Sequence, residues 1–253
     1  MHAHAIQLDQ VWHDRSANHA LARTAVENLK PAPGDLVVLP EMFPVGFTMN
    51  VAEVCDGADD TDAFFSTLAK DFGIYVIGGN VRQPDALGRN EAAVYAPDGA
   101  CVVRYHKIHP FSFADEHLHY RGGDEIKLFA AGAFTVAPFI CYDLRFPEAF
   151  RLAVKQGAQV LVVIANWPAA RVGHWLALLT ARAIENQCYV IGCNRVGHDP
   201  NVAYPGRSQI IDPRGKILVD AGDTPGVASA HLDLDALVAY RKSFPALNDI
   251  RLI

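Results

Sequence analysis

Short, continuous apolar runs constrain the fold of this chain more than any other feature. Five of them are DLVVLPEM, GIYVIGGNV, TVAPFI, QVLVVIAN and QCYVIGCNRV. Strands that are apolar on both faces are typical of sheets covered on both sides. Helical patterns separate the runs, at residues 15–29, 60–71, 147–156 and about 173–186, and a further short strand is expected at 3–7. We therefore expect an α/β fold in which helices connect neighbouring strands.

Two hairpins complete the pattern. EAAVYAPDGACVVRYHK turns at Pro-Asp-Gly, and SQIIDPRGKILVD turns at Asp-Pro-Arg-Gly, one in each half of the chain. The two similar halves predict mixed sheets with helices on their outer faces. No linker or change in composition divides the chain, so we expect residues 1–253 to form one domain. Functional side chains of such a fold gather at the carboxyl ends of its strands.

Charge and composition exclude several classes of function. The formal net charge is −6 and the basic residues are scattered, which argues against binding to nucleic acid or an anionic membrane. No stretch reaches the ~18 uninterrupted apolar residues of a membrane-spanning helix. The start, MHAHAIQLDQ, lacks the features of a secretory signal, and the five cysteines form no CxxC pair. We expect a cytoplasmic protein that acts on a small molecule without a metal or cofactor.

Cys141 is the candidate nucleophile. It stands where TVAPFI ends and a helix with Pro147 near its first position is about to begin. A strand-to-helix turn exposes its residue, and the partial positive charge of a helix start is expected to lower the pKa of a nearby thiol. The alternative is a buried apolar role. We keep that role for Cys55, Cys101, Cys188 and Cys193. For Asp143 and Arg145 we expect a local ion pair or hydrogen bonds to the loop.

Three charged residues could assist a cysteine nucleophile, which needs a base and an oxyanion donor. Glu41 follows the apolar run LVVLP, so its carboxylate would emerge at the end of a buried sheet. Lys107 closes the hairpin strand CVVRYHK at the same kind of edge, and Glu116 lies in FADEHLHY. For each residue taken alone, a solvated surface side chain is the commoner role.

The ordered set LPEMF, YHKIHPF and ICYDLRFPE resembles the nitrilase superfamily of carbon–nitrogen hydrolases. ANWPAARVGHW and ARAIENQCYVIGCNRVG are also similar to that family, so the resemblance covers nearly the whole chain. LPEMFPVGFTMN and KIHPFSFADEHLHYRGG look most like the omega-amidase branch, which hydrolyses 2-oxo dicarboxylic acid monoamides such as 2-oxoglutaramate. The fold that the resemblance implies is a four-layer αββα sandwich, usually dimeric through the helices next to the cysteine strand.

The resemblance also implies roles for the candidate residues. Glu41 would be the general base and Cys141 the nucleophile that forms a thioester. The Lys107 ammonium and the Tyr142 backbone N–H would hold the oxyanion, and Glu116 would orient the water or Lys107.

Substrate-binding residues are expected near the same strand ends. Asn166 and Trp167 end the run QVLVVIAN, so Trp167 could wall the pocket, and Phe43 and Phe47 could do likewise. Arg171 could bind a substrate carboxylate, because a guanidinium can grip it through two hydrogen bonds. Packing roles for the aromatic rings and a solvated arginine are the alternatives.

Other functions stay open on the sequence alone. Within the superfamily, enzymes that hydrolyse nitriles, carbamoyl compounds or other aliphatic amides share the same catalytic residues. A binding protein without turnover is a further alternative. The HxH pairs His2/His4 and His117/His119 suggest a metal-dependent amidohydrolase as another alternative. A catalytic pair usually follows a strand, however, and His2/His4 begins one.

Overall fold

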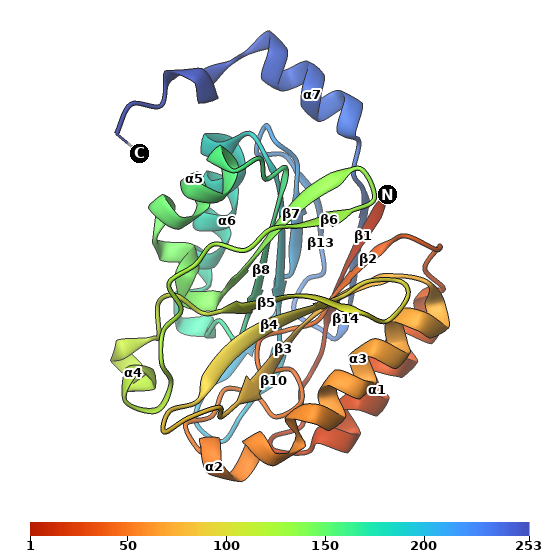
Figure 1. Ribbon diagram of the computed structural model, residues 1–253, viewed down its shortest axis with the longest axis vertical. Coiled ribbons are helices and arrows are strands. Elements are labelled where there is room, and N and C mark those ends of the chain that lie inside the picture. The colour runs from red at the N-terminus through yellow and green to blue at the C-terminus, as the bar shows by residue number, and fades with distance from the viewer. Residues whose placement is uncertain (253) are drawn as a thin grey trace.

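Two six-stranded mixed sheets pack face to face in the computed structural model, which describes residues 1–252 (Figure 1). The first sheet has the order β14-β1-β2-β3-β4-β5 and the second has the order β13-β12-β9-β8-β7-β6. The strands of the first sheet are β1 (His2–Gln7), β2 (Leu36–Val38), β3 (Tyr75–Arg82), β4 (Arg89–Tyr95), β5 (Cys101–His106) and β14 (Gly226–His231). Those of the second are β6 (Phe129–Ala131), β7 (Phe134–Ile140), β8 (Val160–Ala165), β9 (Tyr189–Asn194), β12 (Gln209–Ile211) and β13 (Ile217–Asp220).

Helices cover the outer face of each sheet (Figure 1). Helices α1 and α3 lie against the first sheet, and α5 and α6 lie against the second. The predicted α/β sandwich with two mixed sheets and external helices is therefore confirmed. The helices are α1 (Arg15–Leu29), α2 (Val51–Val54), α3 (Ala58–Phe72), α4 (Glu116–His119), α5 (Pro147–Lys155), α6 (Val172–Asn186) and α7 (Leu234–Ser243).

Local sequence signals explain most of these boundaries. Asp14 accepts a hydrogen bond from Ala17 N at 2.9 Å and so caps α1 at its predicted start. Gly157 follows α5 with φ of 104°, a conformation that suits glycine and ends the helix. Every residue of β8 is buried, as expected for a strand between two covered faces. Both predicted hairpins form, as β4 with β5 and β12 with β13.

Several elements carried too weak a local signal to be predicted. Strand β14 pairs antiparallel with β1, so that His2 faces His231 across most of the chain length. A separate two-stranded ribbon joins β10 (Val196–His198) to β11 (Ala203–Pro205). Such short strands depend on partners that are distant in sequence. Of the helices in residues 1–252, none has the length and apolar character needed to cross a membrane.

Candidate active site

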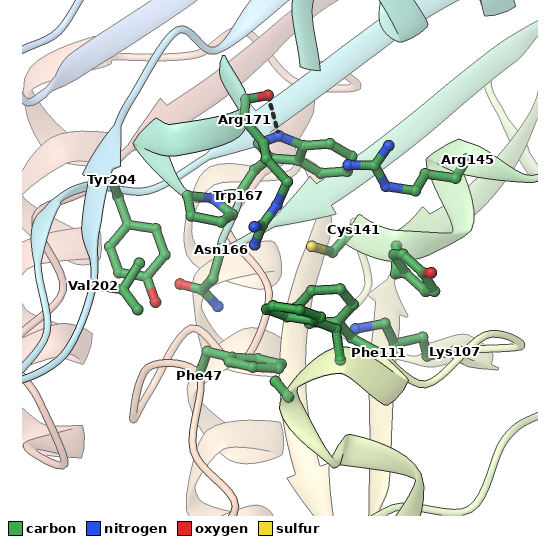
Figure 2. A pocket seen from close by; sticks show the side chains of 14 residues that line it. Phe47, Lys107, Phe111, Cys141, Arg145, Asn166, Trp167, Arg171, Val202 and Tyr204 are labelled. Atoms are coloured by element: carbon green, nitrogen blue, oxygen red, sulfur yellow. Dashed lines mark hydrogen bonds between the residues drawn. The ribbon is translucent and has the colours of Figure 1, made fainter. Parts of the chain in front are cut away.

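The predicted catalytic residues follow strand ends of both sheets. Glu41 comes shortly after β2 and Lys107 directly after β5, both in the first sheet. Cys141 comes directly after β7 and Asn166 directly after β8, both in the second sheet. Because the sheets pack face to face, these segments meet at one edge of the sandwich, as Figure 2 shows for Lys107, Cys141 and Asn166.

Cys141 occupies a strained turn between β7 and α5. Its φ is 45°, a left-handed conformation that is costly for a residue with a Cβ. A 3₁₀ turn spans Cys141–Arg145, and α5 begins only at Pro147. As expected, Asp143 makes hydrogen bonds to the loop, but within residues 1–252 it forms no ion pair with Arg145.

The expected lowering of the thiol pKa by a helix start is wrong. Burial, and then the negative charge of Glu41, raises the pKa of Cys141 well above its usual value, and the positive charge of Lys107 only partly opposes this. The 3₁₀ turn separates Cys141 from the first residue of α5, so the effect of the helix start is outweighed. The resting group is therefore a neutral thiol next to a base.

Lys107 is fully enclosed between two carboxylates. Its Nζ donates to Glu41 Oε1 at 2.8 Å and to Glu116 at 2.8 Å and 3.1 Å. Burial by itself lowers the pKa of Lys107, but the charges of Glu116 and Glu41 outweigh it and hold that pKa well above its usual value. Lys107 therefore carries a positive charge, as an oxyanion donor requires.

Glu41 is held from three sides. Its Oε1 accepts from Lys107 and from Asn90 Nδ2, each at 2.8 Å. Its Oε2 accepts from the backbone N–H of Asn166 at 2.8 Å. Gly79 of β3 lies directly against the Glu41 backbone, where an added Cβ would be 2.7 Å from Glu41 Cα. The carboxylate therefore has one fixed orientation.

Glu116, for which a surface position was the alternative, is completely buried at the start of α4. Its carboxylate accepts from Lys107, from Asn90 Nδ2 at 2.9 Å and from the backbone N–H of Phe111 at 2.6 Å. Glu116 thus connects Lys107 to the segment that forms one wall of the pocket.

A pocket of about 200 Å³ lies over Cys141 and Lys107 (Figure 2). Trp167, Asn166 and Arg171 line it, as does Tyr142. The indole of Trp167 donates to the backbone oxygen of Arg171 at 2.8 Å and so fixes the two residues together. The other lining residues are Phe47, Phe111, Phe113, Ala114, Arg145, Pro168, Val202 and Tyr204.

Two guanidinium groups face this pocket without a carboxylate partner in residues 1–252. Arg171 lies over the rings of Phe111 and Phe113, at 5.4 Å and 5.9 Å from their centroids. Arg145 lies 4.9 Å from the centroid of a Trp167 ring and contacts His174. Figure 2 shows the Arg171 side chain reaching down into the pocket. The pocket is therefore apolar along its walls and positively charged at its rim.

Phe43 is not a pocket residue, and this prediction is corrected. Its ring is fully buried between α1, α3 and the first sheet, where it stacks with His19 and Phe64. The turn that follows β2 directs Phe43 into the core beneath α1 and α3 and directs Phe47 toward the pocket, where the Phe47 ring lies 5.4 Å from Lys107 Nζ. The spacing of the two residues in the sequence did not show which ring faces the pocket.

Several residues of the site were missed: the lining residues Phe111, Phe113, Ala114, Arg145 and Pro168, and also Asn90, Val202 and Tyr204. Asn90 of β4 donates to both glutamates, and its polar side chain at the start of a mostly apolar strand was the available signal. Val202 and Tyr204 reach the pocket from the β10–β11 ribbon. Nothing in the local sequence placed that ribbon near Cys141.

The two HxH pairs lie apart from the pocket lining. His4 contacts Ser229 and Asp35 at the starts of the strands, and His117 and His119 are exposed on α4. No group of three or more His, Cys, Asp or Glu residues within 1–252 is placed to hold a metal ion.

The chain is similar to known proteins over nearly its whole length. A model of the family described as carbon–nitrogen hydrolase matches residues 3–242. A 2-oxoglutaramate amidase of Bacillus subtilis (strain 168) is 34% identical over 249 residues, which cover 97% of this chain and 96% of the relative. An omega-amidase of Yersinia enterocolitica is 41% identical over 254 residues, 96% of this chain and 94% of the relative. The crystal structure of a CN-hydrolase superfamily protein from Xanthomonas campestris, with an arsenic adduct in its active site, has a TM-score of 0.94, 33% identity, and coverage of 100% of this chain and 98% of that one.

Proposed function

Because this chain belongs to the carbon–nitrogen hydrolase family, we propose that it is a cysteine-dependent amidase for 2-oxo dicarboxylic acid monoamides. The substrate is 2-oxoglutaramate or 2-oxosuccinamate, and the products are the dicarboxylic acid and ammonia. The names of the relatives support this substrate class. The observation that carries the proposal is a thiol, a carboxylate and a charged lysine at one pocket whose rim holds Arg171, which has no carboxylate partner in residues 1–252.

In the first half of the reaction, Glu41 takes the proton of the Cys141 thiol, and the sulfur attacks the amide carbonyl carbon. The carbonyl oxygen gains the negative charge, which the Lys107 ammonium and the Tyr142 backbone N–H stabilise. The C–N bond then breaks, and Glu41 returns its proton to the departing nitrogen to give ammonia. A thioester remains on Cys141.

In the second half, Glu41 removes a proton from a water molecule, which attacks the thioester carbonyl. The C–S bond breaks, Glu41 returns its proton to the departing sulfur, and the carboxylic acid leaves with the thiol restored. Glu116 acts through Lys107, with which it shares two hydrogen bonds, and keeps the ammonium charged and in place for both oxyanions.

Arg171 is the residue we propose for the substrate carboxylate. A guanidinium that faces an apolar pocket and is stacked on aromatic rings loses little freedom when it binds an anion. Trp167, Asn166 and Phe47 then enclose the short carbon chain between this carboxylate and Cys141.

We also propose that residues 1–253 act as one domain, and the family match over residues 3–242 supports this. The five unpaired cysteines support the cytoplasm as its location. A homodimer through α5 and α6 is supported by Leu152 and Ile184, large apolar side chains that are 41% and 51% exposed on these outer helices (Figure 1).

The test is an amide panel measured by ammonia release, with intact-mass spectrometry to detect an acyl adduct on Cys141. Wild type should prefer 2-oxoglutaramate or 2-oxosuccinamate to an uncharged amide of equal length. Arg171→Met should lower that preference, measured as the ratio of the two kcat/KM values, by about 10- to 100-fold. Cys141→Ala should lose turnover by several orders of magnitude, because no other group forms the thioester.

Iodoacetamide should abolish the activity and EDTA should leave it intact. An active Cys141→Ala variant, or loss of activity to EDTA alone, would contradict the mechanism. Faster hydrolysis of the matching nitrile than of the amide would contradict the substrate class.

A further inference from the structure

The carboxylate of Asp143 is completely buried and accepts four hydrogen bonds, although it does not line the pocket. Its Oδ1 lies 3.0 Å from the backbone N of His109 and 2.8 Å from the His109 ring Nδ1. Its Oδ2 accepts from the Tyr105 hydroxyl at 2.8 Å and from the backbone N–H of Ile140 at 3.0 Å. Each oxygen thus has two donors, which is what a buried carboxylate requires.

These donors come from the two segments that carry the reacting groups. Tyr105 and His109 lie two residues before and after Lys107, at the end of β5 in the first sheet. Ile140 immediately precedes Cys141, at the end of β7 in the second sheet. One side chain therefore connects the lysine segment to the nucleophile turn, and it does so across the two sheets.

The nucleophile turn needs such support. A left-handed residue such as Cys141 persists only where its surroundings hold it. Arg182 supports the far end of the turn by donating twice to the backbone oxygen of Leu144, at 2.7 Å and 3.2 Å. The His109 ring stacks on Phe146, with centroids 3.7 Å apart. Asp143 supports the near end, through hydrogen bonds from Tyr105 and His109 on either side of Lys107.

We propose that Asp143 is a positioning residue that sets the placement of the Cys141 sulfur relative to the Lys107 ammonium. Attack and oxyanion stabilisation occur on one carbonyl group, so sulfur and ammonium must be correctly placed at the same moment. This role rests on the proposed thioester mechanism. It requires no contact between Asp143 and the substrate.

The decisive variant is Asp143→Asn, which keeps the size of the side chain but replaces one acceptor oxygen by an NH₂ group. Whichever way the amide turns, a backbone N–H is left without an acceptor, either that of Ile140 or that of His109. We expect kcat for the amide to fall about 30- to 100-fold while KM changes about threefold or less.

Alkylation of Cys141 by iodoacetamide separates positioning from a merely structural role. Alkylation needs the thiol but no oxyanion donor, so its rate constant in Asp143→Asn should stay within about threefold of wild type. Turnover needs both groups and should fall far more. Equal losses of alkylation and turnover, or a wild-type kcat, would overturn the proposal.

Asp35→Asn is the matched control. Asp35 is also a buried carboxylate that accepts backbone N–H groups, from His2 at 2.8 Å and Ala32 at 2.9 Å, and it contacts His4. It precedes β2, at the opposite end from Glu41. Its replacement should lower thermal stability and leave kcat unchanged.

Two milder variants keep the test valid if Asp143→Asn does not fold. Tyr105→Phe and His109→Gln each alter one donor to Asp143, and each should lower kcat by a smaller factor without slowing alkylation. The two losses should be non-additive, because they act through one carboxylate. Wild-type kcat in both would overturn the role of Asp143.

The result for Cys141→Ala keeps the two proposals apart. Turnover that survives in Cys141→Ala defeats the thioester mechanism, whatever Asp143 does. An inactive Cys141→Ala beside a fully active Asp143→Asn defeats only the positioning role.

Discussion

The two carboxylates beside Lys107 determine its charge state. A lysine this deeply buried would lose its proton without nearby carboxylates, and Glu41 and Glu116 prevent that at 2.8 Å each. Burial, and then the negative charge of Glu41, raises the pKa of Cys141, and the positive charge of Lys107 offsets this only in part. In the proposed mechanism the thiol therefore passes its proton to Glu41 during attack, because the raised pKa of Cys141 disfavours a resting thiolate.

This charge state predicts the pH dependence of thiol reactivity. Because the pKa of Cys141 is raised above its usual 9.0, the thiolate fraction stays small at neutral pH and grows as pH rises. Iodoacetamide alkylation of substrate-free enzyme should thus keep accelerating through pH 9.0. Stopped samples analysed by mass spectrometry give this rate constant at each pH.

Glu41→Gln supplies the control for the same measurement. It removes a negative charge that raises the pKa of the thiol, so the alkylation profile should move to lower pH while amide hydrolysis is lost. A plateau below pH 9.0 in wild type would contradict the assigned charge state.

At the scale of elements, strand ends position the reacting groups and close packing between strands fixes their backbone. β3 approaches the turn after β2 so closely that only glycine fits at position 79. A Cβ there would lie 2.2 Å from the backbone N of Met42. Glycine is therefore needed at position 79 because any side chain would collide with the backbone of Glu41 and Met42, and not because of a positive φ.

Gly79→Ala should displace Glu41 from Lys107. We expect kcat to fall at least about tenfold, with a loss of about 1–3 kcal/mol in the free energy of unfolding from overpacking. Steady-state kinetics and urea unfolding measure the two effects.

Gly226→Ala in β14 is the matched strand variant, because an added Cβ would meet only Thr224 O at 3.9 Å. It should leave kcat unchanged and alter the free energy of unfolding by about 0.5 kcal/mol or less. Equal kinetics for the two alanine variants would show that Gly79 does not position Glu41.

At the scale of the whole molecule, the site exists only because the two sheets pack together. The first sheet supplies Glu41 and Lys107, and the second supplies Cys141 and Asn166. Cys193 of β9 marks this packing, since its sulfur donates to Ile6 O at 3.4 Å and Val38 O at 3.3 Å in the opposite sheet. The expected buried role is confirmed for Cys193 and Cys188, but it is wrong for Cys101, which is exposed, and for Cys55, which is only half-buried.

The proposed dimer is tested at this scale. Light scattering should give twice the chain mass of 27.6 kDa. Leu152→Asp combined with Ile184→Asp should convert the dimer to a monomer, because two charges would be buried without partners in the interface. Val102→Asp, at a residue that is 46% exposed on β5, should not change the mass. A wild-type monomer would contradict the proposed dimer.

Local sequence patterns predict the alternation of strands and helices, and with it the order of Glu41, Lys107 and Cys141 at strand ends. Apolar periodicity, capping residues and turn residues act over a few positions, so α1, α5, β7 and both hairpins could be read locally. The resemblance of three short motifs then supplied a role for each residue. The expectation that these residues share one pocket rested on the sandwich fold that the resemblance implies.

The neighbours that complete the site could be identified only once the two sheets were seen packed together. Asn90, Tyr204 and Asp143 act through contacts with residues far away in the sequence, and no local pattern encodes such contacts. The same holds for Phe43, which turns into the core, and for Cys141, whose pKa follows burial and two nearby carboxylates rather than the start of α5. Packing and electrostatic fields depend on distances in space, and those distances are set when the two sheets come together.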